Sequence, residues 1–411
     1  MDESLKSRIH DNLVAGRAGQ FLFLKELIRT PSQNPPGDSA AVAELTVKTL
    51  KSLGFGVERH PVPDGLVRER GLSAITNLVV RHEFSSGPVV ALNAYGDTGL
   101  AGDGWTADPL GGEIKDGVVY GLGALTKADL AVYAHALAAL RDARPDLSGT
   151  VELHFTFDGE GDGRLGPGWL LEEGIVNPDY AVGSGYAYGI GTSAMGDLQL
   201  RVEIEVLGAP GDAPDPPADA MEATTRVLNA LYGIRDGLGG IQSEIPGIGS
   251  PELVIGEIEG GTRPDAAPGR VVFALHRSLI PDEDPAAVEA GLTNLIAATA
   301  SRSKGIVCRI GRINLSAPMK PGPGTDKLSQ ALEGQAAEVM DGPIWVTGVP
   351  YNTNSRHYAA LGIPTVLYGA GPATPDAGHA GAADERLVLD DLRKATEVTA
   401  RALAEFLTPA A

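Results

Sequence analysis

The chain has 411 residues, of which 43% are hydrophobic and 21% are charged, a balance typical of a soluble globular protein. This length exceeds the size at which one hydrophobic core keeps growing, so we expect two domains. The formal net charge of −20 argues against nucleic acids and anionic membrane surfaces as partners, because both would repel the chain. No stretch approaches the roughly 20 uninterrupted apolar residues of a membrane span. A single cysteine, Cys308, fits a reducing compartment, and we expect a cytoplasmic protein.

The first half of the chain alternates between helical and strand-like patterns. Apolar residues at helical spacing predict helices over 17–30 and 40–56. The elements expected after these are strands at 77–80, 88–94, 150–157 and 179–185 and helices at 128–143 and 168–174. Strands that alternate with helices indicate a largely parallel sheet that is covered on both faces.

The pattern changes near residue 195. The segment 196–208 alternates polar and apolar residues, as a strand with one solvent-exposed face does. The elements expected next are a helix at 218–234, strands at 252–261 and 269–280, a helix at 285–301 and a strand at 305–314. This order is typical of a ferredoxin-like α+β domain. We therefore expect an α/β domain of residues 1–194 and 316–411, into which an α+β domain of residues 195–315 is inserted.

Several polar motifs follow the predicted strands. They are ALNAYGDTG (91–99), GWTADPLGGEIKDGVVYGLGA (104–124), HFTFDGEGDGRLG (154–166), GTRPDAAPGRV (261–271) and GHAGAADERL (378–387). In this order and spacing the chain resembles the M20 metallopeptidases, which include aminoacylases, acyl-diaminopimelate and acetylornithine deacylases and glutamate-releasing carboxypeptidases. The resemblance implies a mostly parallel sheet flanked by helices and an inserted domain that serves as a lid and dimerisation element. We therefore expect a homodimer formed through residues 195–315, and we take 199–207 as an edge strand suited to pairing across a two-fold axis.

The resemblance also implies a catalytic centre with two zinc ions, held by five side chains, and a glutamate that acts as general base on a bridging water. At the position of the first zinc histidine this chain has Tyr95, although the aspartate two residues later is retained as Asp97. Thr126 or Lys127 occupies the place of the bridging aspartate, and Asp129 is the nearest carboxylate that could substitute for it.

The remaining family positions are also altered. The paired glutamates become Gly159 and Glu160, so a zinc ligand is retained and the general base is lost. The next ligand, an acid after the following strand, is missing, since no acid occurs between residues 179 and 197. His379 matches the last ligand histidine, while Asp212 and Asp265 align with a lid histidine and a lid asparagine. Only Glu160 and His379 remain of the five ligands, and two ligands rarely hold zinc.

We therefore predict a cleft without the zinc pair, in which Tyr95 fills the volume of the missing imidazole and first metal ion. Its hydroxyl would hydrogen-bond Asp97 or a ligand. The side chains expected to act there are Tyr95, Asp97, Lys127, Asp129, Glu160, Asp212 and His379. Simpler roles stay open for three of them: Asp97 as a loop-bracing carboxylate, Lys127 as an exposed lysine at a helix start, and His379 as a surface residue of its loop.

Substrate contacts are expected from two further segments. Arg277 lies where the family places a substrate-binding arginine and would grip a carboxylate in a bidentate manner, although another offset puts Ser278 there. In YNTNSRH, the side chains of Asn352, Asn354 and Arg356 match a family segment that shapes the substrate pocket, and Arg356 would bind a carboxylate or form a structural ion pair.

Three hypotheses on function follow. The leading one is an enzyme that acts without metal on a small amino-acid-derived or acyl-amino-acid substrate, through C–N or acyl chemistry driven by acid and base side chains. The second is a single-zinc amidohydrolase that holds its ion through Glu160, His379 and either Asp129 or Asp97. The third is an inactive homologue kept for ligand binding or as a scaffold. The first hypothesis needs no cofactor, and the second needs one zinc ion.

Overall fold

A computed structural model describes residues 2–143, 146–207, 218–261, 263–372 and 377–409. The chain forms two compact units. The first comprises residues 1–192, 321–347 and 354–411, and the second comprises residues 193–320 and 348–353. Each unit has its own cluster of buried hydrophobic side chains, so each has a separate core.

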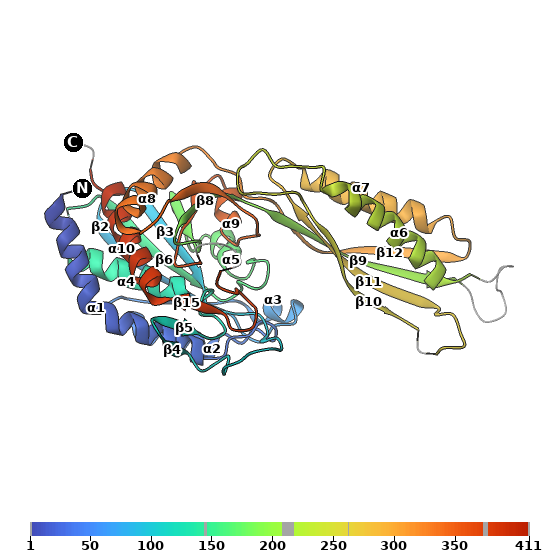
Figure 1. Ribbon diagram of the computed structural model, residues 1–411, viewed down its shortest axis with the longest axis horizontal. Helices are drawn as coiled ribbons and strands as arrows, with labels where there is room; N and C mark the ends of the chain where they lie inside the picture. Colours follow the sequence, from blue (N-terminus) through green and yellow to red (C-terminus); the bar gives the residue numbers. More distant parts are fainter. Residues whose placement is uncertain (1, 144–145, 208–217, 262, 373–376, 410–411) are drawn as a thin grey trace. The chain divides into compact units, whose positions relative to one another are not determined.

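The first unit is built on a mixed sheet, which has eight strands within the described residues (Figure 1). In spatial order these strands are β1 (Glu58–Pro61), β2 (Thr76–Ser85), β6 (Gly149–Thr156), β3 (Val89–Tyr95), β7 (Tyr180–Gly183), β14 (Thr365–Leu367), β8 (Gly189–Ala194) and β13 (Trp345–Val349). The central pairings of β6 with β3, β3 with β7 and β7 with β14 are parallel. The pairings of β1 with β2, β2 with β6 and β14 with β8 are antiparallel. The predicted fold class, a mostly parallel α/β sheet flanked by helices, is confirmed.

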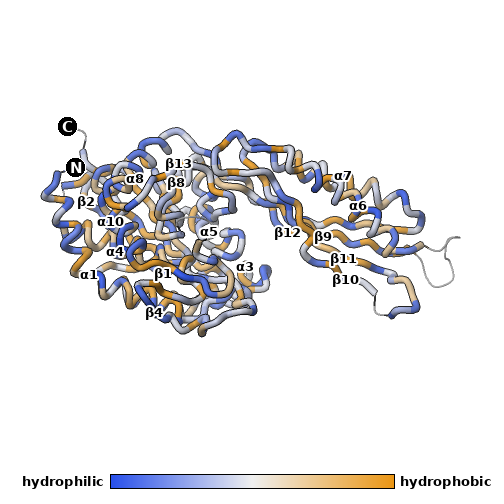
Figure 2. Tube along the Cα trace, viewed as in Figure 1, coloured by the Kyte–Doolittle hydropathy of each residue, from blue (hydrophilic) through white to orange (hydrophobic). Residues whose placement is uncertain are grey.

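Helices cover both faces of this sheet. Successive residues of a strand point to opposite faces, so one strand contributes side chains to the cores on both sides. Leu78 and Val80 of β2 join the larger core, whereas Val79 between them joins a smaller one on the other face. The helices packed on the larger core are α1 (Glu3–Arg29), α2 (Ala40–Ser52), α4 (Ala128–Asp142), α8 (Thr325–Val339) and α10 (Leu389–Phe406). Short helices lie on the other face: α3 (Asp64–Glu69), α5 (Pro167–Glu172) and α9 (Arg356–Ala360). Figure 2 shows hydrophobic and hydrophilic stretches alternating along the helices and strands of this unit.

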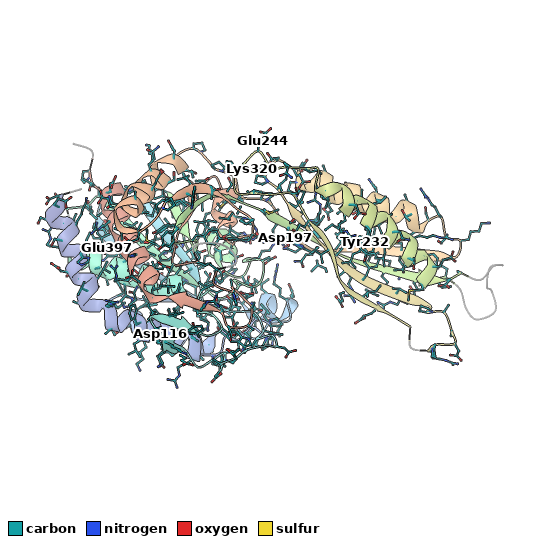
Figure 3. All side chains as sticks on the ribbon, viewed as in Figure 1. Asp116, Asp197, Tyr232, Glu244, Lys320 and Glu397 are labelled. Atoms are coloured by element: carbon teal, nitrogen blue, oxygen red, sulfur yellow. The ribbon has the colours of Figure 1, made fainter. Side chains whose placement is uncertain are left out.

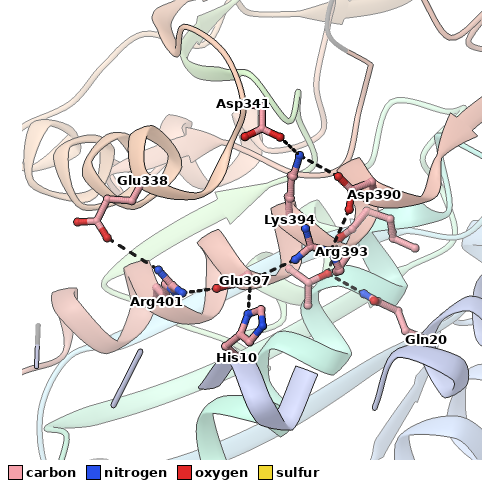
Figure 4. Close-up of polar contacts among 11 residues, drawn as sticks. His10, Gln20, Glu338, Asp341, Asp390, Arg393, Lys394, Glu397 and Arg401 are labelled. Atoms are coloured by element: carbon pink, nitrogen blue, oxygen red, sulfur yellow. Dashed lines mark hydrogen bonds and ion pairs between the residues drawn. The ribbon is translucent and has the colours of Figure 1, made fainter. Parts of the chain in front are cut away.

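A network of charged side chains ties the helices of the larger layer together (Figure 4). Glu397 of α10 is 4% exposed, and its carboxylate contacts His10 of α1 at 3.1 Å and Arg393 at 3.3 Å. Arg401, one turn further along α10, donates to the other oxygen of Glu397 and lies 3.8 Å from Glu338 of α8. Buried carboxylates of this kind are stable only when they are paired.

Among the features of the first unit that were not expected from the sequence are the start of α1 and a second, smaller sheet. Helix α1 begins at Glu3 rather than near residue 17, and the Asp2 side chain caps it by accepting the Ser4 amide. A small antiparallel sheet also forms from β15 (Arg386–Val388), β5 (Val118–Tyr120) and β4 (Glu113–Lys115). It brings the C-terminal part of the chain beside the loop after β5, where the Gly121 amide donates to the carbonyl of Glu385 at 2.9 Å.

The second unit has the predicted ferredoxin-like order. Its elements are β9 (Gly196–Val206), α6 (Ala220–Leu238), β10 (Leu253–Gly260), β11 (Arg270–Leu279), α7 (Pro285–Ala300) and β12 (Ile306–Ser316). Its antiparallel sheet has the order β10-β11-β9-β12. The expectation that 199–207 is an edge strand is wrong, since β9 pairs with β11 on one side and β12 on the other. None of the helices in the described ranges is long and apolar enough to cross a membrane.

Candidate active site

The predicted polar residues gather where two parallel strands end. Tyr95 is the last residue of β3, and its register partner Thr156 is the last residue of β6. Asp97 therefore follows one strand and Glu160 the next at the same edge of the sheet, which is the position at which α/β folds bind ligands. Asp97 is buried, Tyr95 is half-buried and Glu160 is exposed.

Asp97 holds the loop that carries Glu160. Its carboxylate accepts the backbone amides of Gly159 at 2.7 Å and Glu160 at 3.0 Å, and the side-chain amide of Asn34 at 3.1 Å. Burial raises the pKa of Asp97, and these hydrogen bonds to the charged form oppose that rise. These contacts match the loop-bracing alternative. Asn34 was not singled out in the sequence, because it lies more than 60 residues before its partner.

The Tyr95 ring lies directly against the backbone of Gly159. A Cβ atom added at Gly159 would stand 2.0 Å from Cδ2 and 2.4 Å from Cγ of Tyr95. A side chain at position 159 and this placement of Tyr95 therefore exclude each other. Burial raises the pKa of Tyr95, and the negative charges of Glu160 and Asp97 raise it further, so the phenol keeps its proton. Tyr95 can thus donate a hydrogen bond at neutral pH.

Glu160 is the accessible carboxylate of the group. Desolvation by surrounding protein atoms raises its pKa to about 7, and the charges of Asp97 and Glu385 add to this rise. A hydrogen bond from the Gly99 backbone acts in the opposite direction. A carboxyl group with a pKa near the working pH can both accept and donate a proton.

Lys127 immediately precedes α4 and is buried, at 1% exposure, so the alternative of an exposed lysine is wrong. Its Nζ donates to the carbonyls of Leu27 at 2.7 Å and Thr30 at 3.0 Å, which lie at the end of α1. The Leu27 carbonyl also accepts the Thr30 amide at 3.3 Å, so Lys127 adds a second donor to this last turn of the helix. Burial lowers the pKa of Lys127 to about 8, while Asp97 and Glu385 oppose the change.

Further buried carboxylates accept hydrogen bonds from backbone amides. Asp129, in the first turn of α4, accepts the Ala370 amide at 2.7 Å, and burial raises its pKa to about 7. Glu385, which the sequence did not single out, is fully buried and accepts the amides of Leu125 at 2.7 Å and Gly381 at 3.2 Å. Burial raises the pKa of Glu385 as well. No periodicity marks Glu385, and one of its two partners, Leu125, lies 260 residues away in the sequence.

His379 lies outside this buried group. Its side chain is exposed, and its backbone has a φ of 56°. Nδ1 lies 3.1 Å from the carbonyl of Ala383, and Nε2 lies 3.5 Å from the Arg386 guanidinium. These contacts stay within the loop of His379 and the strand that follows it, and its predicted catalytic role stays a prediction.

Asn354 and Arg356 donate hydrogen bonds to the loop that carries Glu160, residues 158–162. The Asn354 amide donates to the carbonyls of Asp158 at 3.1 Å and Gly159 at 3.2 Å, and Arg356 donates to the carbonyl of Asp162. Asp97 and Asn354 thus hold the same short segment, one through its amides and the other through its carbonyls. Asn354 and Arg356, which were predicted to contact the substrate, therefore donate hydrogen bonds to backbone carbonyls of the protein.

The other predicted substrate residues belong to the second unit. The buried Arg277 donates to Glu283 at 2.6 Å, and the exposed Asp265 accepts Arg263 at 2.6 Å. Asn352 donates at 2.7 Å to Asp197, which is labelled in Figure 3. Each of them is paired within this unit, and a role in substrate binding stays a prediction. Asp212 lies outside the described residues.

The donors that are present do not fit a two-zinc centre. In the part of the chain that the structure describes, no three His, Cys, Asp or Glu side chains converge so that they could hold one metal ion. Where the family resemblance predicts an imidazole the chain has Tyr95, and the oxygens of Asp97, Asp129 and Glu385 accept backbone amides. A stable zinc site usually needs three or four converging ligands.

The mixed sheet, the polar groups at its strand ends and the inserted ferredoxin-like unit together define a fold of the amidohydrolase type. The family model for Peptidase family M20/M25/M40 matches residues 97–405, and the chain belongs to this family, as the sequence motifs predicted.

Known relatives agree with this assignment. A succinyl-diaminopimelate desuccinylase of Gluconacetobacter diazotrophicus is 34% identical over 164 residues, which cover 38% of this chain and 40% of the relative. Another, from Rhizorhabdus wittichii, is 30% identical over 50% of this chain and 54% of the relative. The chain thus matches about half or less of the length of these relatives.

Solved structures share the fold along the whole chain. The dipeptidase Dug1p of Saccharomyces cerevisiae has a TM-score of 0.78 with 15% identity and covers 98% of this chain and 99% of its own. Human carnosine dipeptidase 1 has a TM-score of 0.74 with 17% identity and covers the same shares of both chains.

Proposed function

We propose that this protein is an M20-fold enzyme that acts without a zinc pair on a small amino-acid-derived or acyl-amino-acid substrate, through C–N or acyl chemistry. The observation that carries the proposal is the packing of Tyr95 on Gly159, where an added Cβ would stand 2.0 Å from the ring. In the family this position holds the general base, and the tyrosine ring leaves no room for its side chain.

Glu160 and Tyr95 supply the acid and base groups in this proposal. Glu160, whose pKa is raised to about 7, takes a proton from the attacking nucleophile and returns it to the leaving nitrogen. Tyr95 stays protonated and donates a hydrogen bond to the substrate oxygen on which negative charge develops. Asp97 and Asn354 act as positioning residues, because they hold the amide and carbonyl groups of the backbone that leads into Glu160.

The substrate class rests on the relatives. Their name denotes enzymes that remove a succinyl group from succinyl-diaminopimelate. We therefore place N-succinyl and other N-acyl amino acids first among substrates to be tested. The formal charge of −20 and the single cysteine support a small-molecule enzyme of the cytoplasm.

One observation favours a second candidate, a ligand-binding or scaffold homologue without activity. Lys127 and Asp129 direct their polar atoms to backbone groups, as structural residues do. The single-zinc alternative relies on Glu160 and His379, and the second of these contacts its own loop.

Metal analysis and a chelator assay separate these candidates. The purified protein is assayed against N-acyl amino acids before and after dialysis with a chelator. Activity that survives, with less than about a tenth of an equivalent of zinc bound, supports the proposal, since a working site needs a full complement of metal. Activity that returns only with added zinc supports the single-zinc enzyme. Glu160→Gln should abolish turnover, and Glu113→Gln, at an exposed strand residue, is the matched control.

We further propose that the second unit, residues 193–320 and 348–353, serves as the lid and as the surface of a homodimer. The family resemblance supports this, and the free edges of its sheet are β10 and β12 rather than β9. Light scattering coupled to size-exclusion chromatography measures the mass directly. A species of 42.5 kDa at micromolar concentration would contradict the dimer.

A further inference from the structure

A pocket of about 220 Å³ lies in the first unit between α1 and α4, beside the end of α2. Its apolar lining includes Leu13, Leu53 and Ala138, and its polar lining includes Asn12 and His135. An engineered cavity of about 150 Å³ is known to hold benzene, so this pocket has room for an aromatic ring with a small substituent. None of these residues belongs to the candidate active site.

His135 presents a hydrogen-bond acceptor to this pocket. The residue is 6% exposed, and its Nδ1 lies 2.9 Å from the carbonyl of Ala131. A carbonyl only accepts, so Nδ1 carries the ring hydrogen and Nε2 is left with a lone pair. Among the residues that the structure describes, none donates a hydrogen bond to Nε2 of His135. Burial lowers the pKa of His135 to about 4, which keeps the ring neutral at physiological pH.

Two glycines of α1 leave the imidazole edge uncovered. A Cβ added at Gly16 would lie 4.0 Å from Cδ2 of His135, and one added at Gly19 would lie 3.9 Å from Nε2. These are ordinary contact distances, and neither glycine has a positive φ, so the backbone does not require glycine at either position. Glycine inside a helix is destabilising relative to alanine. Of the two glycines, Gly16 lines the pocket, so it keeps open a space that alanine or a larger residue would narrow.

We propose that this pocket binds a small, uncharged aromatic molecule that carries one O–H or N–H group. The ring would pack against Leu13, Leu53 and Ala138, and the donor would point at Nε2 of His135. Anionic ligands are disfavoured, because the exposed Asp142 also lines the pocket and the chain carries a net charge of −20. This site is independent of the proposed function.

Phenol and toluene are suitable probes, since they have the same size and differ in one hydrogen-bond donor. Each is titrated into the full-length protein, and binding is followed by NMR of the His135 ring nitrogens and by calorimetry. Phenol should bind about three- to tenfold more tightly than toluene, the usual net gain of one hydrogen bond, and should shift the Nε2 resonance. Equal affinities, or no binding of either probe, would overturn the proposal.

Two variants test the location. Gly16→Leu fills the pocket without removing His135 and should abolish phenol binding, whereas Gly233→Leu, at an open position of α6, should bind phenol as the wild type does. His135→Leu removes the acceptor and should make the affinities for phenol and toluene equal. Phenol binding that survives Gly16→Leu would place the site elsewhere and refute the proposal.

Discussion

The contact between Tyr95 and Gly159 allows a quantitative test of the candidate site. The three nearest atoms to a Cβ added at Gly159 all belong to the Tyr95 ring, at 2.0, 2.4 and 2.7 Å. Carbon atoms normally approach to about 3.5–4.0 Å, so Gly159→Ala forces the ring to move by roughly 1.5 Å. Overpacking of this kind costs about 1–3 kcal/mol. Gly159 has no positive φ, so alanine adds no backbone strain that would confuse the result.

A double-mutant cycle measures how much of the cost of Gly159→Ala depends on the Tyr95 ring. In a Tyr95→Ala background the ring is absent, and Gly159→Ala should then change the free energy of unfolding by less than about 0.5 kcal/mol. The coupling between the two substitutions is therefore expected to be about 1–3 kcal/mol. Gly102→Ala is the control, because a Cβ there meets nothing within 4 Å.

Urea unfolding followed by tryptophan fluorescence is the suitable assay. The three tryptophans, Trp105, Trp169 and Trp345, all belong to the first unit, so their fluorescence reports the unit that contains the candidate site. If Gly159→Ala is as stable as the wild type, or if its cost persists without the tyrosine ring, the argument that Tyr95 excludes a side chain at position 159 fails.

Three further predictions concern buried charges. The folded-state pKa of Lys127 is lowered to about 8 from 10.5, so between these pH values the unfolded chain binds more protons than the folded chain. The free energy of unfolding of the wild type, relative to that of Lys127→Met, should therefore rise between pH 8 and 10.5 in urea unfolding. The pKa of Asp129 is raised to about 7 from 3.8, so between these pH values the folded chain binds more protons than the unfolded chain. The wild type should therefore lose stability in thermal unfolding as the pH rises from 4 to 7, and Asp129→Asn should lack this pH-dependent loss. Glu397→Ala removes a buried carboxylate from Arg393 and Arg401, which keep only Asp390 and Glu338 as partners, and should cost about 1–3 kcal/mol in urea unfolding. Glu338→Ala, at a side chain 49% exposed, should cost less than about 1 kcal/mol in the same assay.

Much of the fold could be predicted, because the sequence patterns follow from local rules. Apolar spacing separated helices from strands, and the order of elements identified the inserted unit with its strands β9 to β12. Short strands such as β4, β5 and β15 were not predicted, since three residues are too few to show an alternation of polar and apolar side chains. The early start of α1 was missed because its first turns carry more polar than apolar residues, and tertiary packing of Leu5 and Ile9 holds them.

The sequence indicated these site residues through the family resemblance and through the end of one predicted strand. It selected Tyr95, Asp97 and Glu160, which the structure has at one edge of the sheet, because β3 and β6 are parallel neighbours. It could not reveal that Glu385 is buried beside them or that Lys127 reaches back to α1. Such contacts depend on loop conformations, and a single sequence carries no signal for them.

The distribution of backbone amides explains why Glu160 is central to the proposed function. Carboxylates packed together in a protein interior repel one another, and each must find a proton, a cation or hydrogen-bond donors. Asp97, Asp129 and Glu385 find donors in the backbone, and Lys127 contributes a positive charge near two of them. These groups are therefore already engaged in holding the fold. All four carboxylates have a raised pKa, but only Glu160 is exposed, so it is the carboxylate through which a proton can be exchanged with a bound substrate.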